Sequence, residues 1–312
     1  MCLQLEFNYK SQVLHKNLIK MKNNTLETRI KQKALDTIVI SNERVLVKTF
    51  DELKAQNPRT SLKNFEKEIL ASNWELLFKK YPVAQKNIIK QEKDTNQLFS
   101  SIINAFEKDK EDLAHFNILP STDFQIKNIE IGVGDFHSGT STAIIELTNQ
   151  TKIVYKPTNG EISEAYYQLL DFINSHYSLG SYKFKSLNRK EYQWLEFVTY
   201  DDCKTNIDIE LYYKRAGVII GLVYLLNGCD YHYENITAKG SSLVLIDHET
   251  IIQPKIAKKY RLFFKQFIET TEESVLDSFL LPNKKTASLL PKGMCGLGYH
   301  KQTHFQGVEK VG

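Results

Sequence analysis

Apolar side chains in the first part of the chain recur three or four residues apart, which is the spacing of one helix face. The pattern covers residues 62–78, with Thr60 or Ser61 as its cap, and returns over residues 95–116. Gly is absent from this part of the chain and Pro is rare. These features predict an N-terminal helical region over residues 1–125.

Two stretches interrupt the helical pattern. Tyr81-Pro82-Val83 predicts a break, because a proline inside a helix removes a backbone donor and clashes with the preceding turn. Residues 1–45 have only a weak pattern and are expected to be loosely ordered.

Beyond Ile126 the apolar period shortens to two, which is typical of strands. The predicted strands cover residues 129–133, 141–147, 152–156 and 192–200. A helix over residues 161–174 separates the third strand from the fourth. We assign residues 126–200 to a second region.

A long helix is predicted over residues 210–226, ended by Asn227-Gly228. A hairpin follows, and its second strand covers residues 243–246. Further on, the chain turns irregular, with Gly293, Gly296 and Gly298 close together. We assign residues 201–312 to a third region.

Composition narrows the class of protein. An apolar fraction of 42%, a charged fraction of 25% and a net charge of +4 are ordinary for a globular protein and predict no nucleic-acid partner. The four cysteines form no CxxC pair and no zinc-ligand spacing, which favours a reducing cytoplasmic location. The longest apolar run, residues 216–226, is too short to cross a bilayer, so we predict no membrane segment.

A glycine-containing turn between two strands, followed by a strand that ends in lysine, is how kinases cover the phosphates of ATP. Gly134 and Gly139 would let the backbone approach these phosphates, and Lys156 would neutralise their charge. A plain hairpin turn and a solvated lysine explain the same residues. Asp135 and His137 suit proton transfer, or alternatively an Asx turn and a surface histidine.

A more specific pattern starts at Asp230. Asn235 follows it by five residues, which is the separation of the base and the metal-binding asparagine in the kinase catalytic loop. Asp247 follows a hairpin that would return the chain to Asn235, so both side chains could share Mg²⁺, a cation that prefers oxygen ligands. A chance match of these residue types is the alternative.

Neighbouring side chains leave alternatives open. His232 would donate to a phosphate or orient the base, or else serve as a structural imidazole. Glu249 would bind the metal or order its waters, or else be solvated. Glu161 or Glu164 would pair with Lys156, and the sequence does not choose between them, while a solvated helix face explains either residue as well.

Several short blocks, taken in order, resemble the dehydratase domain of class II (LanM-type) lanthipeptide synthetases. The blocks are Gly134-Asp135-Phe136-His137-Ser138-Gly139, Val154-Tyr155-Lys156-Pro157, Trp194-Leu195-Glu196-Phe197-Val198, Asn227-Gly228-Cys229-Asp230-Tyr231-His232-Tyr233-Glu234-Asn235 and Leu245-Ile246-Asp247-His248-Glu249. The resemblance covers roughly residues 75–250.

The resemblance implies an α+β, protein- or lipid-kinase-like two-lobed fold. It also implies that Ser and Thr hydroxyls of a ribosomally made precursor peptide with a leader are phosphorylated from ATP with Mg²⁺, and that the phosphate is then eliminated. The roles carried over by motif are ATP phosphate binding for Lys156, phosphotransfer for Asp230 and His232, Mg²⁺ binding for Asn235 and Asp247, and elimination for Asp135 and His137.

The chain departs from the family pattern in four places, one of which is an N-terminal part that we expect to be shortened. Few residues follow Asp247, so we expect an incomplete C-lobe and impaired elimination. The family's zinc cyclase domain has no counterpart, and Thr158 stands where the family often has Arg. We therefore expect a truncated dehydratase, as a fragment, split-gene product or decayed copy, that works with a separate cyclase or a missing C-terminal part. The alternatives are a non-catalytic peptide-binding remnant and a small-molecule or lipid kinase.

Overall fold

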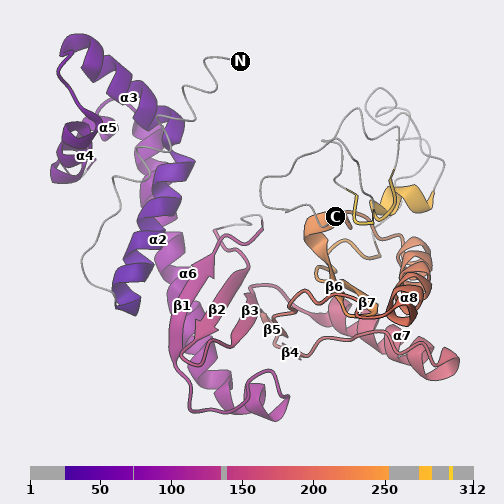
Figure 1. Ribbon diagram of the computed structural model, residues 1–312. Helices are drawn as coiled ribbons and strands as arrows, with labels where there is room; N and C mark the ends of the chain where they lie inside the picture. The colour runs from indigo at the N-terminus through magenta and orange to yellow at the C-terminus, as the bar shows by residue number, and fades with distance from the viewer. Residues whose placement is uncertain (1–24, 73, 135–138, 253–273, 283–294, 298–312) are drawn as a thin grey trace. The chain divides into compact units, whose positions relative to one another are not determined.

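The computed structural model describes residues 25–72, 74–134, 139–252, 274–282 and 295–297 (Figure 1). The chain divides into two units. The first contains Met1–Thr158 and Glu191–Glu196, and the second contains Asn159–Lys190 and Phe197–Gly312. Each unit is described by itself.

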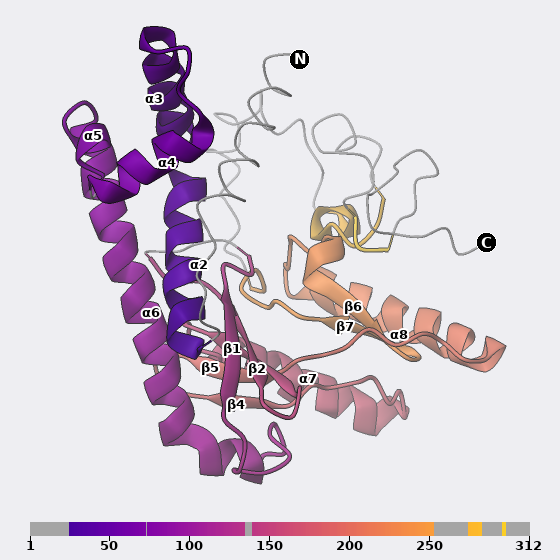
Figure 2. The same ribbon diagram turned by 60° about the vertical axis from the view of Figure 1, so that its left-hand side comes forward.

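Helices form the first part of the first unit. They are α2 (Leu26–Ser41), α3 (Glu43–Gln56), α4 (Leu62–Ala71), α5 (Glu75–Phe78) and α6 (Pro82–His115). Helix α2 runs alongside α6 (Figures 1 and 2). The expectation of loose order over residues 1–45 is therefore wrong from Leu26 onward, because tertiary burial of Ile38 and Val39 stabilises a helix whose sequence periodicity is weak.

The helix predicted over residues 62–78 is two helices in the structure. Ser61 caps α4 as expected, since its Oγ accepts a hydrogen bond from the Asn64 N–H at 3.2 Å. The chain then turns at Trp74, whose φ of 68° lies in the left-handed region and whose N–H donates to Ile69 O. The turn interrupts the helix while both Trp74 and Leu77 stay buried.

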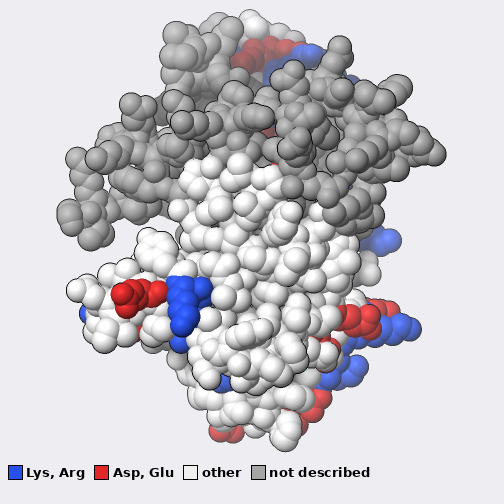
Figure 3. Space-filling view, turned by 90° about the vertical axis from the view of Figure 1, so that its right-hand side faces the viewer, with Lys and Arg blue, Asp and Glu red and all other residues white. Residues whose placement is uncertain are grey.

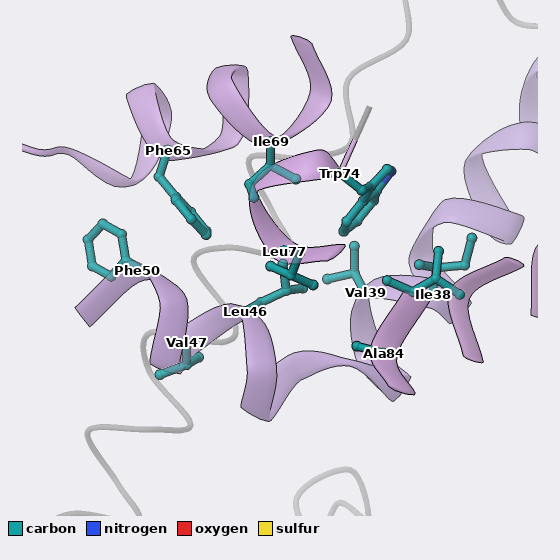
Figure 4. Packing of buried hydrophobic residues seen from close by; sticks show 11 residues of the cluster. Ile38, Val39, Leu46, Val47, Phe50, Phe65, Ile69, Trp74, Leu77 and Ala84 are labelled. Atoms are coloured by element: carbon teal, nitrogen blue, oxygen red, sulfur yellow. The ribbon is translucent and has the colours of Figure 1, made fainter. Parts of the chain in front are cut away.

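One hydrophobic core joins these helices (Figure 4). Its buried members are Ile38, Val39, Leu46, Val47, Phe50, Phe65, Ile69, Trp74, Leu77, Ala84 and Ile88. The rings of Phe50 and Phe65 lie 5.5 Å apart in a tilted arrangement, within the range preferred by aromatic pairs. Burial on this scale stabilises the helical part at roughly 25 cal/mol per Å² of apolar surface removed from water.

The break predicted at Tyr81-Pro82-Val83 is confirmed, since α5 ends at Phe78 and Pro82 begins the next helix. Pro82 occupies the first turn of α6, where the backbone N–H would have no helical partner in any case. The predicted start near residue 95 is therefore wrong, and α6 is 34 residues long. Its charged first half hides the periodicity that its buried residues, including Leu98, Ile102 and Phe106, reveal later in the helix.

A sheet completes the first unit. Its strands are β1 (Ile126–Ile131), β2 (Ala143–Leu147), β3 (Lys152–Lys156) and β5 (Gln193–Glu196), paired antiparallel in the order β1-β2-β3-β5. Strand β3 has the predicted bounds. Strand β5 is shorter than predicted, and β1 begins earlier and ends before Gly132.

The second unit contains α7 (Glu161–Tyr177), β4 (Ser186–Asn188), α8 (Asn206–Leu225), the 3₁₀ helix η1 (Tyr233–Asn235), β6 (Ile236–Lys239), β7 (Ser242–Leu245) and the 3₁₀ helix η3 (Val275–Ser278). Helix α8 starts before the predicted residue 210, because Thr205 and Asp208 form a capping box. Its end is as predicted. Asn227 has a φ of 51°, and the Gly228 N–H donates to Val223 O at 2.8 Å.

Helix α8 is apolar on more than one side. Ala216, Ile219, Leu222 and Val223 are buried, whereas Ile207, Ile209, Tyr213, Tyr224 and Leu225 are exposed. Figure 3 views the molecule from the side of α7 and α8 and shows few charged side chains on the described part of that face. No helix within the described residues is long and apolar enough to span a membrane.

Candidate functional site

The loop after α8 and the β6–β7 hairpin bring the predicted catalytic residues of the second unit together. The Ile246 N–H, directly after β7, donates to Asn235 O at 3.0 Å. This hydrogen bond places the start of Asp247 beside Asn235, although eleven positions of sequence separate Asn235 from Ile246. The return of the chain expected from the hairpin is therefore observed.

Asp230 lies at the exposed tip of this loop. Its φ of 66° is in the left-handed region, which Asp tolerates better than most residues. Its side chain is 56% exposed, and Oδ1 lies 3.6 Å from Nε2 of His232. The carboxylate is thus accessible to a substrate while an imidazole lies next to it.

Asn235 is oriented by the backbone of the same loop. Its Nδ2 donates to Asp230 O at 2.8 Å, with the amide orientation assigned from this bond. The amide nitrogen also lies 3.4 Å from Nε2 of His232. Because the nitrogen is turned towards the protein backbone, the oxygen Oδ1 is the atom left to bind a cation.

His232 is positioned through its other ring nitrogen. The Glu234 N–H donates to Nδ1 at 3.3 Å, which assigns the proton of a neutral ring to Nε2. In that tautomer Nε2 can donate to Asp230 but forms no hydrogen bond with the Asn235 amide nitrogen, which is itself a donor. Nε2 faces both Asp230 and Asn235. His232 therefore contacts the predicted base and the predicted metal ligand within one short loop.

Asp247 and Glu249 share one turn. The Glu249 N–H donates to Asp247 Oδ1 at 3.1 Å, and the Glu249 side chain is exposed. His248 between them is buried, with its ring 4.6 Å from that of Tyr166 and 5.1 Å from that of Tyr167. Within the described part of the chain, no three His, Cys, Asp or Glu side chains gather as a metal site would require, so the predicted cation site depends on the amide of Asn235.

Two other segments of the second unit form hydrogen bonds with the residues on either side of Asp230 and so hold the loop in place. The Cys229 N–H donates to Thr250 O at 3.3 Å, and the Thr250 hydroxyl donates to Cys229 O. The Tyr231 N–H donates to Ser278 O at 2.9 Å. Sequence reasoning did not identify Thr250 or Ser278, because no local pattern marks a residue that acts through a distant backbone contact.

The loop also shifts the acidity of its own side chains. Burial raises the pKa of the Cys229 thiol above its ordinary value, and the negative charges of Asp230 and Asp277 raise it further. Burial likewise raises the pKa of the Tyr231 phenol. Both groups therefore stay protonated and neutral beneath the exposed Asp230.

The glycine turn belongs to the first unit. Gly134 and Gly139 have φ values of 90° and 85°, which favour glycine. A Cβ on Gly139 would lie 2.4 Å from Oδ2 of Asp94 in α6, so Gly139 itself packs closely on that helix. Asp135 and His137, predicted for proton transfer, lie outside the described residues.

Lys156 ends β3 and is buried, opposite Gln193 of β5. It belongs to the first unit, whereas Asp230, His232, Asn235 and Asp247 belong to the second. Glu161 and Glu164, the two candidate partners of Lys156, lie exposed in the first turn of α7 in the second unit. Burial of a lysine at the end of a strand is consistent with the predicted role in holding phosphate, which stays a prediction.

A hollow of about 640 Å³ lies in the first unit between the α2–α3 turn and the start of α6. Its lining includes Ile40, Arg44, Tyr81 and Val83. None of the predicted catalytic or cofactor-binding residues lines this hollow, and we assign it no part in the candidate site.

Comparison with known proteins relates the chain to lantibiotic biosynthesis. It is 27% identical over 267 residues to the "Lacticin 481/lactococcin biosynthesis protein LcnDR2" of Lactococcus lactis subsp. lactis, covering 80% of this chain and 28% of the relative. The chain thus spans less than a third of that relative's length. This match confirms the relationship to the LanM-type synthetases expected from the sequence blocks. Residues 81–310 match the model of a domain of unknown function, DUF4135, and the chain therefore belongs to the DUF4135 family.

Proposed function

We propose that this protein acts in lanthipeptide biosynthesis as an ATP- and Mg²⁺-dependent enzyme that phosphorylates Ser and Thr side chains of a precursor peptide. Elimination of the phosphate would follow, here or with a further protein part. The observation that carries the proposal is the grouping of Asp230, His232 and Asn235 in one loop, with Asp247 returned to that loop by the β6–β7 hairpin. The similarity to a lantibiotic biosynthesis protein supports the same reading.

The donor set fits a magnesium ion. Asn235 would present its amide oxygen, because its nitrogen bonds to the Asp230 backbone, and Asp247 would add a carboxylate. Mg²⁺ commonly binds through one or two protein oxygen ligands together with waters and substrate phosphates. When bound, Mg²⁺ with ATP would supply the phosphoryl group and neutralise its charge. Glu249, exposed in the same turn, would order waters around the cation.

Asp230 would act as the base. Its carboxylate is exposed at the tip of the loop and would accept the proton of the peptide hydroxyl as that oxygen forms its bond to the γ-phosphorus of ATP, while the bond from phosphorus to ADP breaks. His232 would hold Asp230 in place through its Nε2 proton. A two-lobed kinase-like fold and phosphate binding by Lys156 belong to this proposal as expectations.

The test uses Mg-ATP and the lacticin 481 precursor peptide as a probe, followed by mass spectrometry. We expect the peptide to gain one phosphoryl group per modified Ser or Thr. The Asp230→Asn variant should lose about 10²–10⁴-fold of this rate, the usual contribution of a positioned base. Glu210→Gln, at an exposed position of α8, is the control and should keep the wild-type rate.

The possible products separate the alternatives. Loss of water from the peptide would show that elimination also occurs in this chain, where Asp135 and His137 are the residues to vary. Phosphorylation of a lipid or small molecule but no peptide would favour the general kinase. Peptide binding without nucleotide binding, measured by calorimetry, would refute the enzyme and favour a binding remnant.

A further inference from the structure

The loop that carries Asp230 and His232 is held by a segment far downstream in the chain. The Tyr231 N–H donates to Ser278 O, and His232 forms an antiparallel bridge with Cys295. The downstream segment is itself joined together, since the Gly296 N–H donates to Phe279 O at 2.9 Å and the Leu297 N–H to Leu280 O at 2.8 Å. The loop therefore depends on contacts more than forty residues away.

Gly296 is the residue of the downstream segment at which no space is left for a side chain against the loop. A Cβ at this position would lie 2.6 Å from Tyr231 O and 2.8 Å from Cδ1 of Ile236. Real Cβ atoms essentially never come this close to another heavy atom, and a backbone carbonyl cannot rotate away as a side chain can. Gly296 is not in the left-handed region, so the position requires glycine for space and not for backbone freedom.

The two crowded residues flank the predicted catalytic groups. Tyr231 lies between Asp230 and His232, and Ile236 directly follows Asn235. An added methyl group at Gly296 would therefore push on both the segment of the base and the segment of the metal ligand. The rest of the loop offers little room for this movement, because Cys229 is tied to Thr250 and Tyr231 is fully buried.

We propose that Gly296 is a positioning residue for phosphotransfer, which acts through Tyr231 and Ile236 on the placement of Asp230, His232 and Asn235. This inference rests on the proposed function for its kinetic consequence. A shift of about one ångström at a reacting group lowers the rate by about 10²-fold. Misalignment of the base lowers kcat, whereas loss of uniform substrate binding raises KM.

The test compares Gly296→Ala with Gly217→Ala. Gly217 is exposed in α8 and has no heavy atom within 4 Å of an added Cβ, so the control adds the same methyl group without a clash. Two readouts report the loop without any activity. They are the rate of Cys229 alkylation, followed by mass spectrometry, and the imidazole resonances of His232 in ¹⁵N-labelled protein. The third readout is the steady-state kinetics with Mg-ATP and the lacticin 481 precursor peptide.

For Gly296→Ala we expect a changed Cys229 rate, shifted His232 resonances, and a kcat lowered about 10–100-fold with KM for ATP within about threefold. Gly217→Ala should match wild type in all three. A folded Gly296→Ala protein with unchanged loop readouts, or with wild-type kcat, overturns the inference. If the wild-type protein transfers no phosphate, the proposed function fails, and the two loop readouts alone decide the role of Gly296.

A second variant covers the case in which Gly296→Ala does not melt cooperatively. Adding Ile236→Val removes Cδ1, one of the two atoms within 3.0 Å of the new methyl group; the third contact, Leu280 Cδ2 at 3.4 Å, is less crowded. The double variant should fold and still show shifted His232 resonances relative to Ile236→Val alone, because the contact with Tyr231 O persists. Resonances identical to those of Ile236→Val overturn the inference.

Discussion

Asp230 shows at the scale of one residue how the candidate site is built. Its backbone adopts a left-handed conformation, and its carboxylate is exposed at the tip of the loop. Both neighbours are tied down, Cys229 by Thr250 and Tyr231 by Ser278. The surrounding structure thus stabilises a conformation that costs about 1–3 kcal/mol when it is imposed on a non-glycine residue.

The effect of the Asp230 charge can be measured through the pKa of the neighbouring Cys229 thiol. Because burial and Asp230 both raise the pKa of Cys229, its reactive thiolate is scarce at neutral pH. We expect iodoacetamide to label Cys229 slowly at neutral pH and faster as pH rises through the raised pKa. Asp230→Asn, which tolerates the same backbone conformation, should lower that pKa and move the labelling profile to lower pH. A profile unchanged in Asp230→Asn would contradict this account of the loop.

The glycine turn permits a second test with a matched pair. Gly134 and Gly139 have similar positive φ values, but only Gly139 is crowded, by Asp94. Gly134→Ala should show the cost of backbone strain alone, about 1 kcal/mol, and Gly139→Ala should lose a further 1–3 kcal/mol of unfolding free energy. Urea denaturation measures both. Adding Asp94→Ala should restore most of the extra loss, and equal losses in the two single variants would refute the close packing on α6.

At the scale of secondary-structure elements, local signals and packing contribute differently. Caps were predictable where side chain and backbone lie close in sequence, as at Ser61 and Asn227. The start of α8 was missed because the capping box of Thr205 and Asp208 precedes the apolar stretch on which the prediction relied. Hydrogen bonds of Arg215 connect helix α8 to the rest of the second unit.

Arg215 joins α8 to two other segments. Its Nε donates to Leu179 O at 2.8 Å, and its Nη1 donates to Ser241 O at 2.9 Å. Arg215→Lys replaces a planar fork by a single ammonium, so one carbonyl should lose its partner at a cost of about 1–3 kcal/mol. Thermal and urea unfolding measure this loss. Lys214→Ala, on the exposed side of the same helix, should change stability by less than about 0.5 kcal/mol, and equal effects would contradict the assignment.

At the scale of the whole molecule, contacts between distant parts of the sequence decide the arrangement within each unit. In the first unit, the buried carboxylate of Asp109 in α6 accepts hydrogen bonds from Tyr192 OH at 2.7 Å and Trp194 Nε1 at 2.9 Å. These donors lie more than eighty residues further along the chain. The contact holds β5 against α6, and the Trp194 ring packs edge-on to Phe106.

Substitution of Asp109 should weaken this connection in a graded way. Asp109→Ala leaves the buried Trp194 N–H and the partly buried Tyr192 hydroxyl without this acceptor and should cost about 2–4 kcal/mol of unfolding free energy. Asp109→Asn keeps an acceptor oxygen but loses the charge, and it should cost less. Denaturant unfolding followed by tryptophan fluorescence, to which the two buried residues Trp74 and Trp194 of the first unit both contribute, measures the change. Glu111→Gln, exposed on the same helix, is the control. An Asp109→Ala variant with the wild-type free energy of unfolding would show that the buried contact adds no stability.

Local chemistry alone predicted much of this protein. The spacing of Asp230, Asn235 and Asp247, the hairpin between them and the bounds of β3 follow from turn residues and short periodicities, because these act over a few positions. The family relationship followed from ordered blocks and is confirmed by comparison. The kinase-like fold, the nucleotide and the cation stay predictions.

Only the tertiary structure decided the remaining features, because they depend on residues far apart in the sequence. The turn at Trp74 forms within a shared core, the buried Asp109 of α6 accepts hydrogen bonds from Tyr192 and Trp194, and helix α2 is ordered despite its weak pattern. Around the loop of the candidate site, Ser278 and Gly296 contact the backbone of Tyr231, and no spacing pattern in the sequence predicts these contacts. Short-range patterns in the sequence identify candidate site residues, whereas tertiary packing determines which distant backbone groups hold those residues in place.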